Sequence, residues 1–303
     1  MRAPRAPGGV TAAVVAFAIW GLFPLYLRPL QAVPALQVIA HRVVWSCLLL
    51  LTVLLVRGEL SELRATLAQP SNLRRLAATA TLISLNWLVY VWGVAHGRVL
   101  EASLGYFINP LVNVLLGIAV LSERLNRRQW VSVSIAGFAV AYLTLAAAAV
   151  PWIALTVAVS FAVYGLIRKI IHVEALPGLA AETLLLLPLA AGYLIWCEAQ
   201  GSGAFGHSSL LVDGLLAGSG LVTAIPLLLF AYAARRIAYS AVGVLQYISP
   251  SLQLVCGIVF FHEPFAGARA AGFVLIWFAL AIYALDGLWR ARPRPAEVRR
   301  EAI

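Results

Sequence analysis

Charged side chains are scarce in this sequence. They make up 11% of the 303 residues, whereas hydrophobic side chains make up 62% and the mean hydropathy is +0.92. A soluble globular chain is typically about 45–50% apolar and about 25% charged. The composition therefore excludes an ordinary soluble domain for most of the chain and predicts an all-α integral membrane protein.

Cysteine and the common catalytic motifs are also nearly absent. The three cysteines, Cys47, Cys197 and Cys256, form no CxxC pair, so neither a disulfide framework nor a cysteine metal site is expected. The sequence contains no GxxxxGK[ST] phosphate loop, no HExxH helix and no GxSxG elbow. We therefore expect no cofactor, no metal and no enzymatic activity, and a membrane-embedded enzyme is the least favoured alternative.

What the chain has instead is a series of long apolar runs. About 20 apolar residues are needed for a helix to cross the hydrocarbon layer, and the runs are close to this length. The connections between them are mostly too short for separate domains. We predict ten transmembrane helices, over Gly9–Leu27, Pro34–Val56, Ala77–Ala95, Val99–Leu121, Trp130–Val150, Pro151–Leu166, Leu176–Trp196, Leu215–Ala234, Ala238–Phe261 and Ala270–Leu288.

The net charge of +10 comes from short basic clusters between these runs. No basic stretch is interleaved with aromatic residues, so nucleic-acid binding is not expected. Lys and Arg are enriched in cytoplasmic loops of membrane proteins, and placing the N-terminus inside puts most of the basic residues on the inner side. The sequence therefore predicts that both termini are cytoplasmic.

An internal repeat divides the chain into two halves. Phe17–Leu22 (FAIWGL) reappears as Phe161–Leu166 (FAVYGL), and a shift of 140 residues aligns Ile108, Pro110, Gly117, Ile118 and Glu123 with Ile248, Pro250, Gly257, Ile258 and Glu263. Because five spans is an odd number, the second copy must enter the membrane from the opposite side. We predict inverted five-helix repeats over residues 9–150 and 151–289, with a cytoplasmic tail over 1–8 and a basic tail over 290–303.

Pro110 and Pro250 lie near the middle of the fourth and ninth predicted spans, at corresponding positions of the repeats. Proline removes one backbone hydrogen bond, and interrupted helices at matching positions of two halves are typical of transporter binding sites. We predict helix breaks at both prolines beside a substrate cavity, with a simple packing kink as the alternative. The flanking candidates for substrate contact are Tyr106, Asn109, Asn113, Gln246, Tyr247, Ser249 and Gln253.

Three ionisable residues within the spans are further candidates: His41, Arg42 and Glu182. A charge inside the hydrocarbon layer costs about 2.5–3.5 kcal/mol on insertion scales, so such residues usually face the bundle interior. Arg42 could bind a carboxylate or phosphate, and Glu182 could bind a cation or carry a coupling proton. The two are equivalent if the 140-residue register already holds there, but they would then lie at different depths. The alternative is that each charge snorkels or packs against helix ends.

The third span carries Asn86, Trp87, Tyr90 and Trp92 within two turns. Such side chains suit an aromatic or amphipathic organic solute. Lipid-facing and interfacial tryptophans are common in membrane proteins, so part of this group is expected to play no specific role.

The chain resembles the RarD-type permeases of the drug/metabolite transporter superfamily, which have paired EamA repeats. The resemblance is carried by Glu101–Gly117 (EASLGYFINPLVNVLLG), Asn86–Trp87, Arg168–Lys169, Val173–Ala175, Glu182–Thr183, Leu187–Pro188 and Gln246–Ile248, and it covers roughly residues 9–288. It implies a bacterial inner-membrane secondary transporter whose cavity is enclosed by the first four helices of each repeat, with the fifth and tenth spans peripheral. It leaves the cargo open, because superfamily members include exporters of amino acids and other metabolites.

Together these features predict a secondary active transporter that exports small organic metabolites or drug-like solutes by alternating access. A passive channel or facilitator is the alternative. The expected partners are a small-molecule substrate, membrane lipids and a coupling proton. A homodimer is left open, because Gly137 and Ala141 in the fifth span could form a dimer face or only pack internally.

Overall fold

The computed structural model describes residues 7–95, 99–146, 152–261 and 267–291. Within these ranges the chain is helical and contains no strand, because a helix satisfies its own backbone polar groups without water. The helices are α1 (Pro7–Leu27), the short 3-10 turn η1 (Arg28–Leu30), α2 (Ala35–Val56), α3 (Leu60–Ala68), α4 (Pro70–Ala95), α5 (Val99–Ala119), α6 (Arg127–Ala146), α7 (Trp152–Ile170), α8 (Ala175–Ala199), α9 (Leu210–Arg236), α10 (Tyr239–Gln246), α11 (Ile248–Phe261) and α12 (Gly267–Ala291).

Each predicted apolar run overlaps a helix, and the ninth run is divided into α10 and α11. Helix α3 was not predicted. It is short and amphipathic, with Leu63 buried and Glu62 and Arg64 exposed. Among the described residues, the helices that are long and apolar enough to cross a membrane cover Gly8–Leu30, Ala35–Val56, Trp152–Ile170, Ala175–Ala199, Leu210–Arg236 and Tyr239–Phe260.

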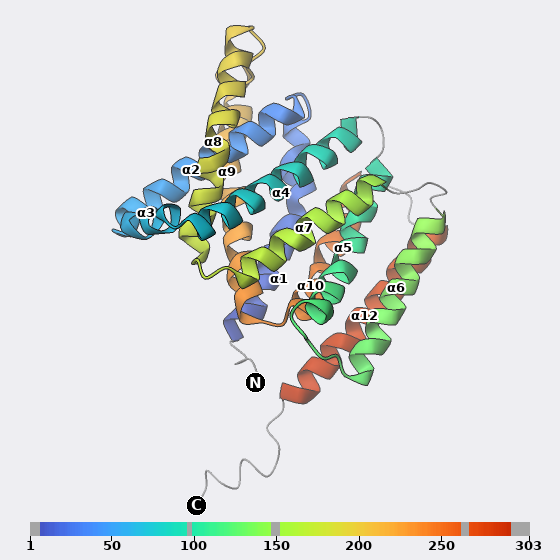
Figure 1. Cartoon of the computed structure of the whole chain (residues 1–303). Helices are drawn as coiled ribbons and strands as arrows, with labels where there is room; N and C mark the ends of the chain where they lie inside the picture. Colours follow the sequence, from blue (N-terminus) through green and yellow to red (C-terminus); the bar gives the residue numbers. More distant parts are fainter. Residues whose placement is uncertain (1–6, 96–98, 147–151, 262–266, 292–303) are drawn as a thin grey trace, which may run out of the picture.

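The helices pack in pairs that join the two halves of the chain. Helix α1 packs against α9 and α11, and α7 packs against α4 and α5. Helix α2 contacts both α8 and α9. Helices α6 and α12 lie side by side at one edge of the bundle, which agrees with the peripheral place that the resemblance implies for the fifth and tenth spans (Figure 1).

The largest buried cluster lies where α1, α7 and α9 meet. The Phe17 and Phe230 rings contact each other edge to face, and the Tyr164 ring stacks on Phe230 with centroids 6.2 Å apart. The outer surface is also apolar: Leu145, Leu189 and Ile195 are exposed, as expected for helices that face lipid rather than water. The bundle therefore has an aromatic interior that connects the halves and an apolar exterior.

Helices α2 and α9 approach so closely that only glycine fits at position 220. A Cβ atom at Gly220 would lie 2.6 Å from the backbone carbon of Trp45, and the Ser46 hydroxyl donates to the Gly220 carbonyl at 3.2 Å. Small residues allow such close helix packing within membranes.

We predict that Gly220→Ala forces α2 and α9 apart and lowers the free energy of unfolding by about 1–3 kcal/mol, the usual cost of overpacking. Thermal unfolding of the detergent-solubilised protein, followed by size-exclusion chromatography, measures the change. Gly192→Ala in α8 is the matched control, because no atom lies within 4 Å of a Cβ there. Equal unfolding temperatures for the two variants would contradict the prediction.

Candidate functional site

A cavity of about 470 Å³ lies between the two halves of the bundle. Its wall is formed mainly by α1, α2, α4, α5, α7 and α11, and it extends to the connection between α1 and α2. A volume of this size suits a small organic molecule. Ten residues that the sequence singled out lie in this wall: Arg42, Asn86, Trp87, Tyr90, Tyr106, Asn109, Gln246, Ser249, Pro250 and Gln253.

Aromatic rings that were not predicted as site residues complete the wall. The Trp20 and Phe161 rings meet edge to face with centroids 5.7 Å apart, and Phe23 lies nearby on α1. Tyr90 and Tyr106, which were predicted, also meet edge to face at 5.6 Å. The repeated FAIWGL and FAVYGL segments contain Trp20 and Phe161, so the repeat itself was the signal that could have identified them.

The predicted asparagines hold helices together. The Asn86 side-chain amide donates to the Val157 carbonyl at 2.7 Å, and the Asn109 amide donates to the Ala158 carbonyl at 2.5 Å. Both bonds tie the first half to α7, and both asparagines are buried. Interhelical bonds of this kind stabilise packing inside a membrane. Their N–H groups are therefore committed to the protein, and the two residues shape the cavity.

Asn113 lies behind the cavity wall. It is buried, and its amide donates to the Gln246 side-chain oxygen at 2.8 Å and to the Asn109 side-chain oxygen at 3.2 Å. In this position Asn113 orients Asn109 and Gln246, which do line the cavity.

Polar side chains of the second half make the corresponding bonds to α1. The Ser249 hydroxyl donates to the Phe17 carbonyl at 2.8 Å, and the Gln253 amide donates to the Trp20 carbonyl at 3.2 Å. Tyr247 lies outside the cavity wall, and its buried hydroxyl donates to the Phe107 carbonyl at 3.2 Å. Its predicted contact with substrate therefore has no counterpart in this arrangement.

The two predicted helix breaks have different outcomes. Helix α5 is continuous through Pro110, which lies beside a void of about 10 Å³ and outside the central cavity, so the break predicted there is not observed. In the second half the helix is interrupted at Tyr247, between α10 and α11, and Pro250 lies in the first turn of α11. A proline in the first turn of a helix loses no intrahelical bond, which explains why α11 begins just before it.

Arg42 projects from α2 into the cavity. Its guanidinium carbon lies 4.5 Å from the centre of the Trp87 ring and 4.9 Å from the centre of the Phe23 ring. Its Nε–H donates to the Thr223 hydroxyl at 2.8 Å. Cation–π contacts and this bond offset part of the cost of placing a guanidinium group among apolar helices.

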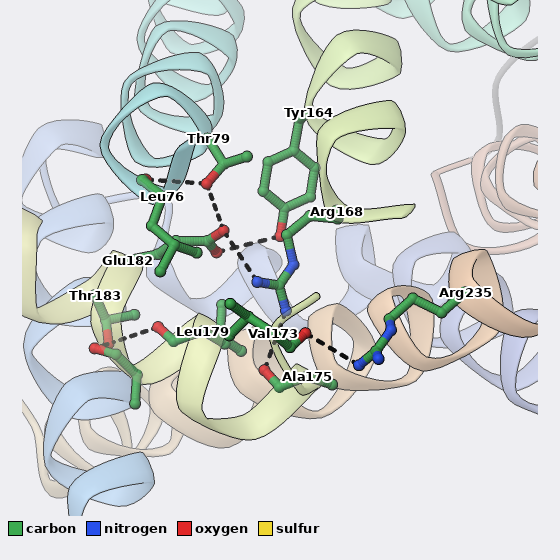
Figure 2. Close-up of polar contacts among 11 residues, drawn as sticks. Leu76, Thr79, Tyr164, Arg168, Val173, Ala175, Leu179, Glu182, Thr183 and Arg235 are labelled. Atoms are coloured by element: carbon green, nitrogen blue, oxygen red, sulfur yellow. Dashed lines mark hydrogen bonds and ion pairs between the residues drawn. The ribbon is translucent and has the colours of Figure 1, made fainter. Parts of the chain in front are cut away.

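Glu182 lies outside the central cavity, in a buried polar cluster (Figure 2). The Thr79 hydroxyl donates to its Oε1 atom at 2.7 Å, and the Tyr164 hydroxyl donates to Oε2 at 3.4 Å. The guanidinium of Arg168, an unpredicted partner from the last turn of α7, lies 3.6 Å from Oε1. Glu182 and Arg168 are each 1% exposed, so the pair is removed from solvent.

Gly178 on α8 provides the space for Arg168. A Cβ atom at Gly178 would come within 2.1 Å of Nη1 of the guanidinium. The Nη2 atom donates to the Ala175 carbonyl at 3.2 Å, whereas Nε and Nη1 make no hydrogen bond to the described residues. The pair is thus held in a tight pocket in which the hydrogen-bonding capacity of the guanidinium is only partly used.

Two further side chains seal this end of the bundle. The Glu123 carboxylate accepts hydrogen bonds from the backbone N–H groups of Tyr239 at 2.6 Å and Ser240 at 2.9 Å, at the N-terminus of α10. The Lys169 ammonium donates to the carbonyls of Ala234 at 2.8 Å and Ile237 at 2.7 Å, at the C-terminus of α9. An acid at a helix N-terminus and a base at a C-terminus are both favourable. We call this region, from Arg168 and Glu182 to Glu123 and Lys169, the closed end.

The opposite end of the bundle carries the rim of the cavity. The Gln37 side chain donates to the Ser202 carbonyl at 2.7 Å and accepts from the Ala204 N–H at 3.0 Å, which docks the α8–α9 loop on α2. In that exposed loop, His207 Nε2 lies 2.7 Å from Oε1 of Glu198. We call this region the open end, because the central cavity reaches it through the α1–α2 connection.

Comparisons with known proteins agree on the type of protein. The model of the EamA-like transporter family matches residues 7–145. Protein RarD of Streptomyces exfoliatus is 44% identical over 95% of this chain and 91% of its own length. The uncharacterized transporter YojE of Bacillus subtilis is 44% identical over 91% of this chain and 93% of its own length. The chloramphenicol-sensitive protein RarD of Pseudomonas aeruginosa is 31% identical over 92% of this chain and 94% of its own length. A solved crystal structure with 20% identity superposes with a TM-score of 0.73 over 93% of this chain and 98% of that chain, which shows a shared fold.

We predict that Arg168 and Glu182 are strongly coupled in stability. Removing either partner leaves a buried unpaired charge, so Arg168→Met and Glu182→Met should each lower the free energy of unfolding by about 3–5 kcal/mol, and the double variant should recover much of this loss. A double-mutant cycle in detergent measures the coupling. The exposed pair Arg57–Glu59, replaced in the same way, is the control and should show coupling of about 0–1 kcal/mol. Additive losses at Arg168 and Glu182 would contradict the prediction.

We predict a pH-dependent contact in the α8–α9 loop. The hydrogen bond and charge of Glu198 raise the pKa of His207 above its ordinary value. The contact therefore persists at low pH and is lost as the pH rises through the raised pKa. An NMR titration of the histidine rings should show this pKa, and Glu198→Gln should return it to the ordinary value. Glu62→Gln, in the exposed face of α3, should leave it unchanged; a pKa of His207 at or below the ordinary value would refute the prediction.

Proposed function

The chain belongs to the RarD-type permeases of the drug/metabolite transporter superfamily, and on this premise we propose that it is a secondary active transporter that moves small organic solutes by alternating access. The cavity between the halves carries the proposal, because it reaches one end of the bundle and is shut off from the other by the closed end. Such an arrangement is one of the two states that alternating access requires.

The proposed topology is ten membrane-crossing helices in two inverted five-helix repeats. In support, the packing is reciprocal: α1 of the first half contacts α9 and α11 of the second, and α7 of the second contacts α4 and α5 of the first. An internal two-fold axis would generate this pattern. Helices α2 and α8 begin at Ala35 and Ala175, which are 140 residues apart, the same shift that aligns Pro110 with Pro250.

In the proposed orientation the closed end faces the cytoplasm of a bacterial cell and the open end faces away from it, across the inner membrane. Basic residues near the closed end support this placement: Arg168 and Lys169 end α7, and Arg235 and Arg236 end α9. Helix α1 begins and α12 ends at one common end of the bundle, in keeping with cytoplasmic termini (Figure 1).

The proposed cargo site is the central cavity, with Arg42, Trp87, Tyr90, Tyr106, Gln246 and Gln253 in its wall. Glu182 keeps its proposed role as the carrier of a coupling proton, since protonation of its carboxylate would release Arg168 and loosen the closed end. Export is the proposed direction, as the resemblance to metabolite exporters implies.

Flux measurements in everted membrane vesicles test this function. Vesicles with and without the protein are offered a metabolite mixture, and the contents are identified by mass spectrometry with and without a protonophore. We expect a solute to accumulate above equilibrium only when the protein is present and the proton gradient is intact. Accumulation that stops at equilibrium and ignores the protonophore would indicate a facilitator, and a new product without movement would indicate an enzyme.

For a solute identified in this way, Trp87→Ala should lower the flux about 10-fold, equivalent to about 1.4 kcal/mol of lost contact. Trp92→Ala is the matched control on the same helix, because Trp92 packs against Trp152 and is absent from the cavity wall. Equal effects of the two variants would argue against this cavity as the route.

A further inference from the structure

The central cavity carries positive charge without an acidic group in its wall. Among the described residues that line it, Arg28 and Arg42 are basic, and none is Asp or Glu. Glu182 lines a separate void of about 10 Å³ that it shares with Arg42, and it is paired with Arg168. The wall therefore repels cations and attracts anions.

Arg42 is held in place but has no counterion among the described residues. The rings of Trp87 and Phe23 hold its guanidinium, and the bond from Nε to Thr223 is its one hydrogen bond to the described residues. No described carboxylate lies within 4 Å of the group. A guanidinium in an apolar setting is costly unless it is paired, and its terminal nitrogens have the geometry to bind a carboxylate with two parallel hydrogen bonds.

Comparison of the two halves shows that Arg42 stands at the position that Glu182 occupies in the second half. Arg42 and Glu182 take the same place in α2 and α8, which begin at Ala35 and Ala175. In the second half, Glu182 meets Arg168 from the last turn of α7, and this contact belongs to the closed end. In the first half the equivalent place is held by Arg42, so a basic group stands where the second half has a carboxylate. The place of the Glu182 carboxylate is therefore taken by the Arg42 guanidinium, which has no carboxylate partner among the described residues.

We propose that the substrate is an organic carboxylate with an apolar body, and that its carboxylate binds the guanidinium of Arg42 in the central cavity. This inference rests on the transport function proposed above and names the class of cargo. The apolar body packs against Trp20, Trp87 and Phe161.

Binding of three probes with one body and different charges tests the proposal: 3-phenylpropanoate, its neutral amide and 3-phenylpropylamine. Isothermal titration calorimetry on the purified full chain gives the three affinities. We expect the carboxylate to bind about 10-fold more tightly than the amide, because a charge-assisted hydrogen bond is worth at least about 1.4 kcal/mol more than a neutral one. The amine should bind most weakly.

Arg42→Gln should abolish the preference for the carboxylate and leave the affinity for the amide within about 3-fold, a change of less than about 1 kcal/mol. Arg42→Lys keeps the charge but loses the planar fork, so it should retain part of the preference. Arg57→Gln removes a positive charge remote from the cavity and should leave all three affinities unchanged. The thermal unfolding temperature of each variant shows whether it is folded. If Arg42→Gln does not fold, the reduced preference of Arg42→Lys tests the proposal instead.

Three results would overturn the proposal: equal or tighter binding of the amide or amine, a preference that survives Arg42→Gln in the folded protein, or no binding of the carboxylate at millimolar concentration. Flux measurements separate its failure from that of the transport function. Gradient-driven movement of a neutral or cationic solute would support the transport function and contradict the proposal that the substrate is a carboxylate. Binding that depends on Arg42, with no flux of any carboxylate, would support the carboxylate site and contradict the transport function.

Discussion

The arrangement of the bundle depends on how it accommodates a buried guanidinium–carboxylate pair. Arg168 and Glu182 are almost fully removed from solvent, and desolvation of two charges is offset only when they find each other and further donors. Thr79 from α4, Tyr164 from α7 and the Ala175 carbonyl at the start of α8 supply those contacts. Three helices, α4 of the first half and α7 and α8 of the second, are thereby joined at one point, and the central cavity lies outside it.

The polar residues around the cavity divide into two groups by their bonds. Asn86, Asn109 and Asn113 donate to backbone or side-chain oxygens of neighbouring helices, so their donors are occupied before a ligand arrives. Arg42 keeps most of its donors for the cavity. The asparagine amides hold the helices around the cavity in fixed positions. The mostly apolar cavity can therefore still offer one specific contact, the Arg42 guanidinium.

The sequence was sufficient for the long helices, because long apolar runs have few alternatives in lipid. It also named part of the cavity wall, including Arg42, Trp87 and Gln246, but not the aromatic rings of Trp20, Phe23 and Phe161. It was not sufficient for Arg168. A basic residue at the end of a span reads as a cytoplasmic loop residue, and only the packing of α8 at Gly178 reveals that the side chain turns inward. The partner of Glu182 and the continuity of α5 through Pro110 likewise depend on contacts between distant segments.

The interruption at Tyr247 has a thermodynamic consequence. In a transporter with two identical halves, exchanging their conformations would turn one access state into the other, and the two states would have equal free energy. In this chain the helix is interrupted at Tyr247, before Pro250, whereas α5 is continuous through Pro110, so equivalent segments of the two halves have different conformations. Every such difference adds to the free-energy gap between the states. In such a transporter, each place where the two halves differ would therefore help to set which access state is preferred.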